Sequence, residues 1–195
     1  MMGQTTIKYR PCYQQIDEGS LVDFLYVQKD ELFLPDKTAV SQVIDVLFHK
    51  GGIFGAFDRQ EQMQAMLGFF FGEPGKEYAN KETGFIYVTA IARSYRLTRL
   101  FRDGFAYSLR QFQQMGVNEI RLQAGEMDRY TNKLYGRFAH PLGKGTTLRG
   151  KPVITYGNTV DDALAALERH KRTKIRHTAN HTDRQTAQHA VALRP

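Results

Sequence analysis

The sequence predicts a mixed α/β fold, with one sheet of about six to seven strands flanked by helices in the order β-α-α-β-β-β-α-β-α-β-β. Short apolar runs rich in β-branched and aromatic residues indicate strands, as at residues 53–57 and 85–91. Apolar residues at steps of three and four indicate helices, most clearly between Leu97 and Phe112. At 195 residues the chain is long enough for one domain with a full core and too short for two.

The first strand and the first two helices are expected before residue 52. Residues 6–9 alternate polar and apolar side chains, as a strand does. Ser20 precedes a run with helical spacing, and Asp23 stands three residues later, as in a capping box, so a helix is expected from Ser20. Asp36 should cap a second helix, which ends at the glycine pair that begins with Gly51.

Three further strands are expected in the middle of the chain. Residues 53–57 and 66–71 should form a hairpin around the polar residues 58–62. Residues 72–83 form a polar loop, which is expected to be a plain connection. The strand at residues 85–91 is apolar enough to be buried on both faces.

A long helix from Leu97 should end at Gly116, because glycine tolerates the left-handed conformation that stops a helix. Residues 119–124 alternate strictly and predict a strand with one buried face. Asp128 should cap a short helix that runs to Tyr135.

The C-terminal part should hold the last strand and the last helix. Residues 141–150 are rich in glycine, and residues 151–156 predict the final strand. Thr159 and Asp162 form a capping box for a helix to about Lys171.

The expected organisation is one domain over residues 1–158, a docked helix over 159–172 and a basic, disordered tail over 173–195. From Arg169 to Pro195 there are seven Lys or Arg and one acid, so this end carries almost all of the net charge of +7. A solvated tail is the main interpretation, and contact with a nucleic acid or a membrane is the alternative.

The sequence also limits where in the cell the protein is expected. No run approaches the roughly 18 apolar residues of a membrane span, so no span is expected. No basic region followed by an apolar block opens the chain, so a secretion signal is not expected. The single cysteine, Cys12, cannot form an internal disulfide, which fits a reducing cytosol. A cytoplasmic protein is expected.

Three motifs resemble those of the GNAT superfamily of N-acyltransferases. The family has a strand end followed by Tyr-Arg-Gly-x-Gly-x-Gly, and this chain has Ile91-Ala92-Arg93-Ser94-Tyr95-Arg96-Leu97-Thr98-Arg99-Leu100-Phe101. The family's Gly-x-x-x-Ile-x-Leu resembles the run from Gly116 to Leu122, and its Leu-Tyr resembles Leu134-Tyr135. The chain departs from the family at Arg99 and Phe101, which replace glycines. It also departs at Asp128, which replaces asparagine, and at Ala139-His140, which replaces Gly-Phe.

The resemblance implies a GNAT-like fold and an N-acyltransferase similar to the long-chain N-acyl amino acid synthases. Such an enzyme moves an acyl group from a thioester to an amine by direct attack. The implied donor is a coenzyme A thioester, either acetyl-CoA or a longer acyl-CoA, or an acyl carrier protein, and no metal is expected. The acceptor is an amine on a small molecule or a protein, and nucleic acid is not an expected partner.

The resemblance also implies roles for particular residues. Tyr135 would protonate the leaving thiolate. Glu126, just after the strand at residues 119–124, is the first candidate base, and Glu73, Glu82 and His140 are the alternatives. The donor-binding residues would be Ile91, Arg93, Arg96, Leu97, Thr98, Arg99, Leu100 and Phe101. Arg96 and Arg99 would bracket a phosphate, as arginine does well.

Each role has a simpler alternative. Tyr135 can be a core aromatic, Glu126 a surface carboxylate, and the arginines a solvated helix start. Cations are disfavoured at a helix N-terminus, which favours an anionic ligand beside them. As a whole, the chain can instead be an inactive module of the same fold that uses its basic tail to hold a protein or nucleic acid.

Overall fold

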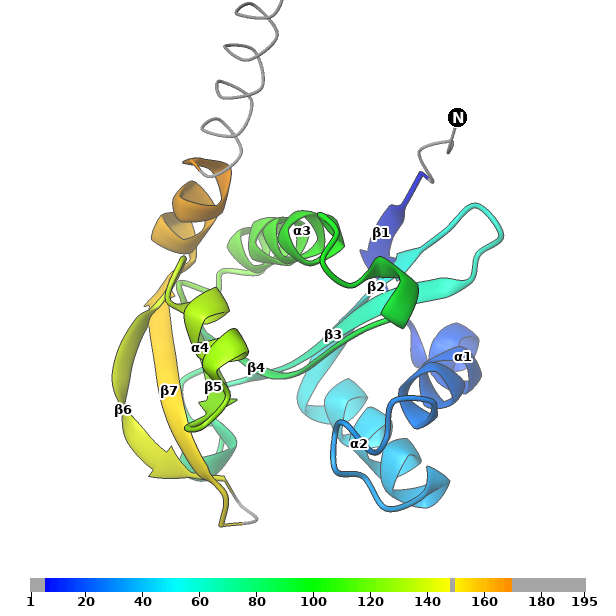
Figure 1. Cartoon of the computed structure of the whole chain (residues 1–195), viewed down its shortest axis with the longest axis horizontal. Coiled ribbons are helices and arrows are strands. Elements are labelled where there is room, and N and C mark those ends of the chain that lie inside the picture. The colour runs from blue at the N-terminus through cyan, green and yellow to red at the C-terminus, as the bar shows by residue number, and fades with distance from the viewer. Residues whose placement is uncertain (1–5, 148–149, 170–195) are drawn as a thin grey trace, which may run out of the picture.

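The computed structural model describes residues 6–147 and 150–169. Within them the chain forms a seven-stranded sheet of order β1-β2-β3-β4-β5-β7-β6 (Figure 1). The strands are β1 (Lys8–Pro11), β2 (Gly51–Phe57), β3 (Met63–Phe71), β4 (Thr83–Ile91), β5 (Glu119–Gly125), β6 (His140–Thr146) and β7 (Pro152–Thr159). Neighbouring strands are antiparallel except β4 and β5, which are parallel. The element order is the predicted one.

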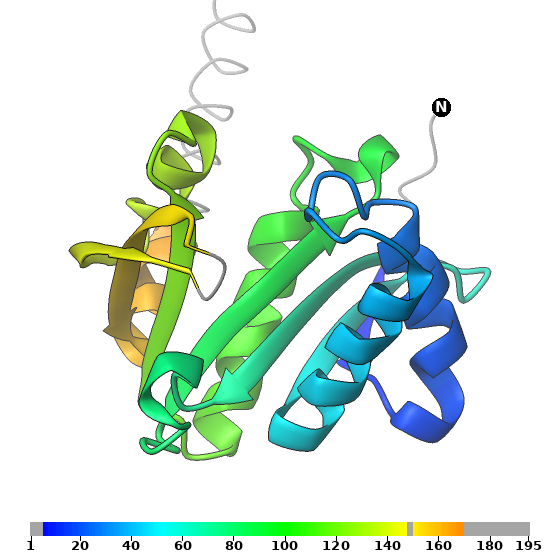
Figure 2. The ribbon, with the colours of Figure 1, turned by 90° about the horizontal axis from the view of Figure 1, so that it is seen from below.

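Helices cover both faces of the sheet. The labelled helices are α1 (Gln14–Tyr26), α2 (Lys37–Lys50), α3 (Leu100–Gln114) and α4 (Arg129–Tyr135). A further helix begins at Val160 and continues to the end of the described chain at Arg169. Helices α1 and α2 lie on one face of strands β1 to β4, and α3 lies on the other face (Figures 1 and 2). None of the helices in the described residues is long and apolar enough to cross a membrane.

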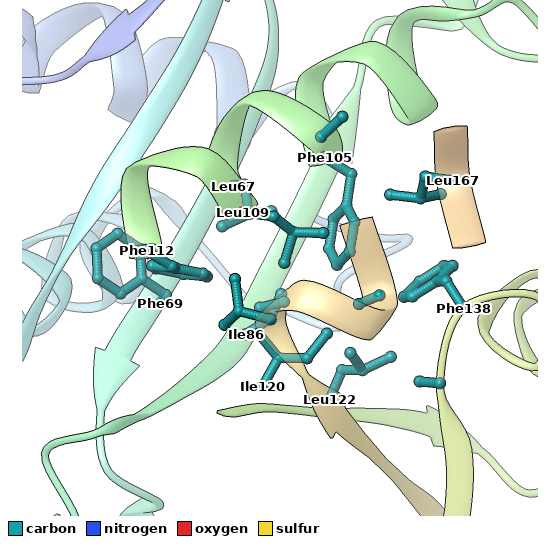
Figure 3. Close-up of a cluster of buried hydrophobic side chains, with 14 of the residues drawn as sticks. Leu67, Phe69, Ile86, Phe105, Leu109, Phe112, Ile120, Leu122, Phe138 and Leu167 are labelled. Atoms are coloured by element: carbon teal, nitrogen blue, oxygen red, sulfur yellow. The ribbon is translucent and has the colours of Figure 1, made fainter. Parts of the chain in front are cut away.

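Two apolar clusters hold these layers together, one on each face. The first cluster joins α1 and α2 to the sheet through fully buried residues such as Leu21, Ile44 and Leu47. The second joins α3 to β5 and the C-terminal helix, with Phe112 and Ile120 completely buried (Figure 3). Burying an aliphatic or aromatic side chain contributes roughly 1.5–3 kcal/mol, so these clusters are the main source of stability.

Strand β4 contains a β-bulge at Tyr87. Val88 lies opposite Gly68 of β3, while Ile86 lies opposite Phe69, so Tyr87 has no residue opposite it. A regular strand would place residues 86 and 88 on the same face. Here Ile86 belongs to the α3 cluster and Val88 packs against the α1/α2 cluster. The bulge therefore exchanges the two faces of β4 halfway along the strand.

Several predicted helix ends are confirmed. The carboxylate of Asp36 accepts the amide of Ala39 at 2.8 Å, and that of Asp128 accepts the amide of Thr131 at 3.0 Å. Gly116 has a φ of +75° and ends α3. The hydroxyl of Thr159 accepts the amide of Asp162 at 3.1 Å. The expected end of this helix near residue 171 and the tail over 173–195 lie outside the described residues.

The N-terminal boundaries were predicted wrongly. Helix α1 begins at Gln14, six residues before Ser20, because Asp17 stabilises its first turn by accepting the amide of Tyr13 at 2.8 Å. Strand β1 covers Lys8–Pro11 rather than residues 6–9. Pro11 is tolerated there because β1 is an edge strand and proline is its last residue.

Three later boundaries also differ from the prediction. Helix α3 begins at Leu100, so Leu97 precedes the helix instead of starting it. The glycine-rich stretch after residue 140 is strand β6, an edge strand whose residues are all exposed. The predicted order includes this strand, but its residues were not assigned to it, because glycines remove the alternation that marks a strand. Strand β7 extends to Thr159, beyond the predicted residue 156.

The structure makes Asp17 a test of how β1 is fixed to α1. Its side chain is 5% exposed and forms two 2.8 Å hydrogen bonds with the guanidinium of Arg10. Replacing Asp17 with Asn should lower the free energy of unfolding by about 3 kcal/mol, because the charge of Arg10 then loses its partly buried partner. Urea unfolding at neutral pH measures this loss.

The same pair should respond to acid. Hydrogen bonds from Arg10 lower the pKa of Asp17, so its contribution is complete above the ordinary pKa of about 3.9 and is lost as the pH falls through the lowered value. The difference between wild type and D17N should therefore shrink below about pH 4. The control is Asp23→Asn, because Asp23 pairs with Lys37 at 2.7 Å but is 71% exposed, and it should lose under about 1 kcal/mol. Equal losses in the two variants would contradict the interpretation.

Candidate active site

The parallel strands β4 and β5 separate halfway along the sheet. They pair only from Thr83 opposite Glu119 to Ile86 opposite Leu122. Beyond that point β5 continues beside β7, and the edge of β4 that faced β5 has no strand partner in the described residues. The separation begins next to the Tyr87 bulge, and a bulge bends and twists its strand. The backbone groups of residues 87–90 on this edge can therefore bind an extended ligand, whereas the carbonyl of Ile91 already accepts Nε of Arg96 at 3.3 Å.

The turn after β4 leads to the N-terminus of α3. After the single 3-10 turn Arg93–Tyr95, the chain is extended at Arg96 and then adopts a φ of +62° at Leu97. The Leu97 side chain is exposed, with 89% of its surface accessible. The hydroxyl of Thr98 donates to the Tyr95 carbonyl at 2.6 Å and accepts the amide of Leu100 at 3.2 Å.

The first turn of α3 has open backbone donors. The first intrahelical bond runs from the amide of Asp103 to the carbonyl of Arg99 at 2.9 Å. In the part of the chain that the structure describes, the amides of Phe101 and Arg102 have no acceptor. A helix N-terminus carries a partial positive charge, so these amides can bind a phosphate.

The arginines of the turn differ in whether they have a partner. Arg96 forms hydrogen bonds of 2.6 and 3.2 Å to the two carboxylate oxygens of Glu31, and Arg93 reaches the same carboxylate at 3.2 Å. These bonds, above all those from Arg96, lower the pKa of Glu31. Arg99 stands at the start of α3 and has no ion pair among the described residues. Arg99 is therefore the cation of the turn that is free for an anionic ligand, whereas Arg93 and Arg96 are engaged.

Ile91, Leu100 and Phe101 line a small apolar cavity between α3 and the sheet. Leu100 is buried, and the ring of Phe101 stacks on that of Phe105 with the ring centres 5.5 Å apart. The ring centre of Phe105 in turn lies 4.7 Å from that of Phe138, which lies shortly after the end of α4 (Figure 3). Phe101 thus connects the start of α3 to the α4 region through aromatic contacts.

Tyr135, the last residue of α4, is half-buried at this aromatic group. Its ring lies 5.9 Å from Phe138 and 5.8 Å from Tyr156 of β7. Burial, with a smaller contribution from Asp128, raises the pKa of Tyr135 to about 12. No hydrogen bond of its hydroxyl occurs within residues 6–147 and 150–169. The phenol is therefore a protonated donor that is available to a ligand.

Glu126 follows β5 directly and is not free. Its carboxylate pairs with the ammonium of Lys144 on β6 at 2.5 Å and is one third exposed. Glu126 therefore contacts β6, which β7 separates from β5, and it must release Lys144 before it can accept another proton.

Two residues of the site were missed by the sequence reasoning. The amide nitrogen of Asn132 donates to the carbonyls of Gly125, Glu126 and Asp128, and its oxygen accepts the hydroxyl of Tyr156 at 2.9 Å. Asn132 thereby fixes the loop that carries Glu126. Its position four residues after the helix cap Asp128 was the only signal. Glu31, the partner of Arg96, had no signal in the sequence.

No group of three or more His, Cys, Asp or Glu side chains in the described residues is placed to hold a metal ion. His177 and His181, the histidines with helical spacing, lie outside those residues. No protein-family model and no curated protein matches this sequence.

Solved structures do match. An assigned GNAT-family acetyltransferase from Desulfovibrio desulfuricans superposes with a TM-score of 0.64 at 16% identity, covering 80% of this chain and 99% of that one. A GNAT-family acetyltransferase from Streptococcus pneumoniae gives 0.60 at 13% identity, covering 79% and 99%. The ribosomal-protein-S18-alanine N-acetyltransferase of Escherichia coli gives 0.59 at 12%, covering 80% and 94%. At these identities the likeness shows that the chain has the GNAT acetyltransferase fold.

Leu97 provides a test of the turn before α3. A residue with a side chain is strained at a φ of +62°, and glycine is not. Leu97→Gly should therefore raise the free energy of unfolding by about 0.5 kcal/mol, the strain relieved less the added chain entropy of glycine. Thermal unfolding should show the melting temperature rising by about 1–2 °C.

Val27→Gly is the matched control, because Val27 is 82% exposed but has a φ of −59°. It should lose about 1 kcal/mol, since glycine there only adds freedom to the unfolded chain. Equal losses in L97G and V27G would show that Leu97 is not strained.

Proposed function

We propose that this chain is an N-acyltransferase that moves an acyl group from a thioester donor to an amine by direct attack. The observation that carries the proposal is the split between β4 and β5. It joins an open strand edge to a helix N-terminus with free amides at Phe101 and Arg102. The named structural neighbours with this fold include enzymes that acetylate a ribosomal-protein alanine.

The donor is a coenzyme A thioester, an elongated molecule with amides in its pantetheine arm and a diphosphate at the other end. The edge of β4 over residues 87–90, which has no strand partner, suits the amides, because it offers backbone donors and acceptors. The amides of Phe101 and Arg102, with the unpaired Arg99, suit the phosphates. An acyl carrier protein supplies the same pantetheine phosphate and is the alternative source.

The reaction needs two proton movements. The nitrogen of the amine attacks the thioester carbonyl carbon, the carbon–sulfur bond breaks, the thiolate gains a proton and the amine nitrogen loses one. We assign protonation of the thiolate sulfur to Tyr135. With its pKa at about 12 against about 8.5 for a thiol, transfer of its proton costs about 5 kcal/mol. This is well below the barrier of about 16 kcal/mol for a turnover of about 10 per second.

We assign the amine's proton to Glu126. The carboxylate can take it only when Lys144 releases its ion pair, and the exposure of both side chains allows this exchange. The incoming ammonium or amine of the acceptor can replace the ammonium of Lys144 at the same oxygen. The acceptor is thus a basic amine, on a small molecule or on a protein.

One observation favours the second candidate, an inactive binding module of the same fold. Arg99 and Phe101 stand where the family has glycines, and the Phe101 ring lies between α3 and the α4 region. A bulky side chain there narrows the approach of a diphosphate to the helix backbone. Donor binding therefore separates the two candidates.

Calorimetric titration of the full chain with coenzyme A, acetyl-CoA and a long-chain acyl-CoA is the direct test. Saturable binding of at least one of them is expected, and Arg99→Ala should weaken it about 10-fold, because a cation at a phosphate is worth about 1.5–3 kcal/mol. Arg110→Ala is the control. Arg110 lies on the second half of α3, away from the helix N-terminus, and pairs with Glu168 of the C-terminal helix. Absence of binding by all three, with the fold intact, would remove coenzyme A as the donor.

Tyr135→Phe tests the acid. Turnover should fall about 10-fold or more with an unchanged donor affinity, because only the proton donor is lost. Since burial raises the pKa of Tyr135 to about 12, its ionisation should cause no loss of rate below about pH 11. Steady-state kinetics against pH measure both effects.

Tyr130→Phe is the control for this variant. Tyr130 lies on the same helix but is 63% exposed, and its loss of a hydroxyl should leave turnover unchanged. Full activity of Y135F would remove Tyr135 from the mechanism.

A further inference from the structure

The loop between α1 and α2 is bonded to the turn that precedes α3. Glu31 of this loop binds Arg96 through both carboxylate oxygens, at 3.2 and 2.6 Å, and Arg93 at 3.2 Å. Glu31 and Arg96 are 65 residues apart in sequence. Two charged hydrogen bonds in parallel fix the plane of a guanidinium, which a single ion pair does not.

Arg96 is fixed from two further directions. Its Nε donates to the carbonyl of Ile91 at 3.3 Å, and one terminal nitrogen donates to the Gln28 side chain at 3.4 Å. Gln28 is itself buried, and its side-chain nitrogen donates to the carbonyl of Phe24 at 3.3 Å. Arg96 therefore joins the last residue of β4 to the end of α1 and to the following loop.

The strained residue of the turn follows Arg96 directly. Leu97 has a φ of +62°, a conformation that is unfavourable for a residue with a Cβ atom. Its exposed side chain forms no packing that could hold it there. Such a conformation persists only when its neighbours fix it. The fixed neighbours are Arg96 on one side and Thr98, bonded to Tyr95 and Leu100, on the other.

We propose that Glu31 is a positioning residue: through Arg96 and Arg93 it holds the turn over residues 93–99 in the conformation that directs the Phe101 and Arg102 amides at the donor phosphate. Arg93 and Arg96 then bind Glu31 rather than the phosphate. The identity of the ligand rests on the proposed function. The role of Glu31 in fixing the conformation of the turn does not.

If these arginines instead bind the phosphate, removing the charge of Glu31 should change the donor affinity in the opposite direction. If Arg93 and Arg96 were phosphate ligands, Glu31 would compete with the donor for them. Removing its charge would then release two cations and tighten donor binding. If Glu31 positions the turn, removing its charge loosens the turn and weakens binding.

The test measures the dissociation constant of acetyl-CoA for the full-length protein by calorimetry. Glu31→Gln should weaken binding about 10-fold, since it removes charged hydrogen bonds from both arginines. In the L97G background the same substitution should weaken binding only about 2-fold, because glycine reaches the required conformation without support. Glu168→Gln removes a comparably exposed ion pair with Arg110 and should change nothing.

A stability measurement tests the turn without any ligand. Leu97→Gly should raise the melting temperature of the wild type, but not that of E31Q, because a turn released from Glu31 has already relaxed its strain. Tighter acetyl-CoA binding by E31Q, or additive effects of E31Q and L97G on the melting temperature, would overturn the proposal. If the wild type binds none of coenzyme A, acetyl-CoA and a long-chain acyl-CoA, coenzyme A is removed as the donor, and the melting temperatures alone decide the role of Glu31.

Discussion

The β-bulge at Tyr87 is the constraint on which the rest of the site depends. It ends the pairing of β4 with β5 at Ile86 and turns the following residues to opposite faces. Thr89 and Ile91 thereby reach the α3 side and line the cavity there, while Ala90 packs under α1 and α2. A parallel pair that stayed in register would have closed the sheet and left no backbone edge for a ligand. One extra residue in a strand thus converts a continuous sheet into a sheet with a binding edge.

The turn after β4 keeps a glycine-like backbone without a glycine. Leu97 has a φ of +62°, a conformation that glycine adopts freely. At Phe101 the replacement acts differently, because the ring fills space between α3 and Phe138 and adds aromatic contacts. At this turn Leu97 thus fixes the path of the backbone, while Phe101 contributes to the surface that a ligand meets. Contacts from elsewhere in the fold replace the conformational freedom that glycine supplies.

The loop between α1 and α2 contacts both sides of the split. Glu31 binds the turn at the end of β4, and the ring of Phe33 lies 3.1 Å from the ammonium of Lys151, directly before β7. Cation–π contacts of this kind contribute about 0.5–1 kcal/mol at exposed sites, so the loop is tied but can move. The loop therefore connects the turn after β4 to the start of β7.

The sequence by itself determined the features that depend on neighbours a few residues apart. The caps at Asp36, Asp128 and Thr159, the end of α3 at Gly116 and the alternation of β5 are all local, and each was read from the chain. The element order followed from such local patterns, whereas the GNAT resemblance rested on the motifs at residues 91–101, 116–122 and 134–135. Only the tertiary structure decided the bulge at Tyr87, the strain at Leu97 and the partners of Arg96 and Glu126. Those features arise between segments far apart in sequence, where the geometry of the whole sheet and the loops around it selects the contact, and no local pattern records that selection.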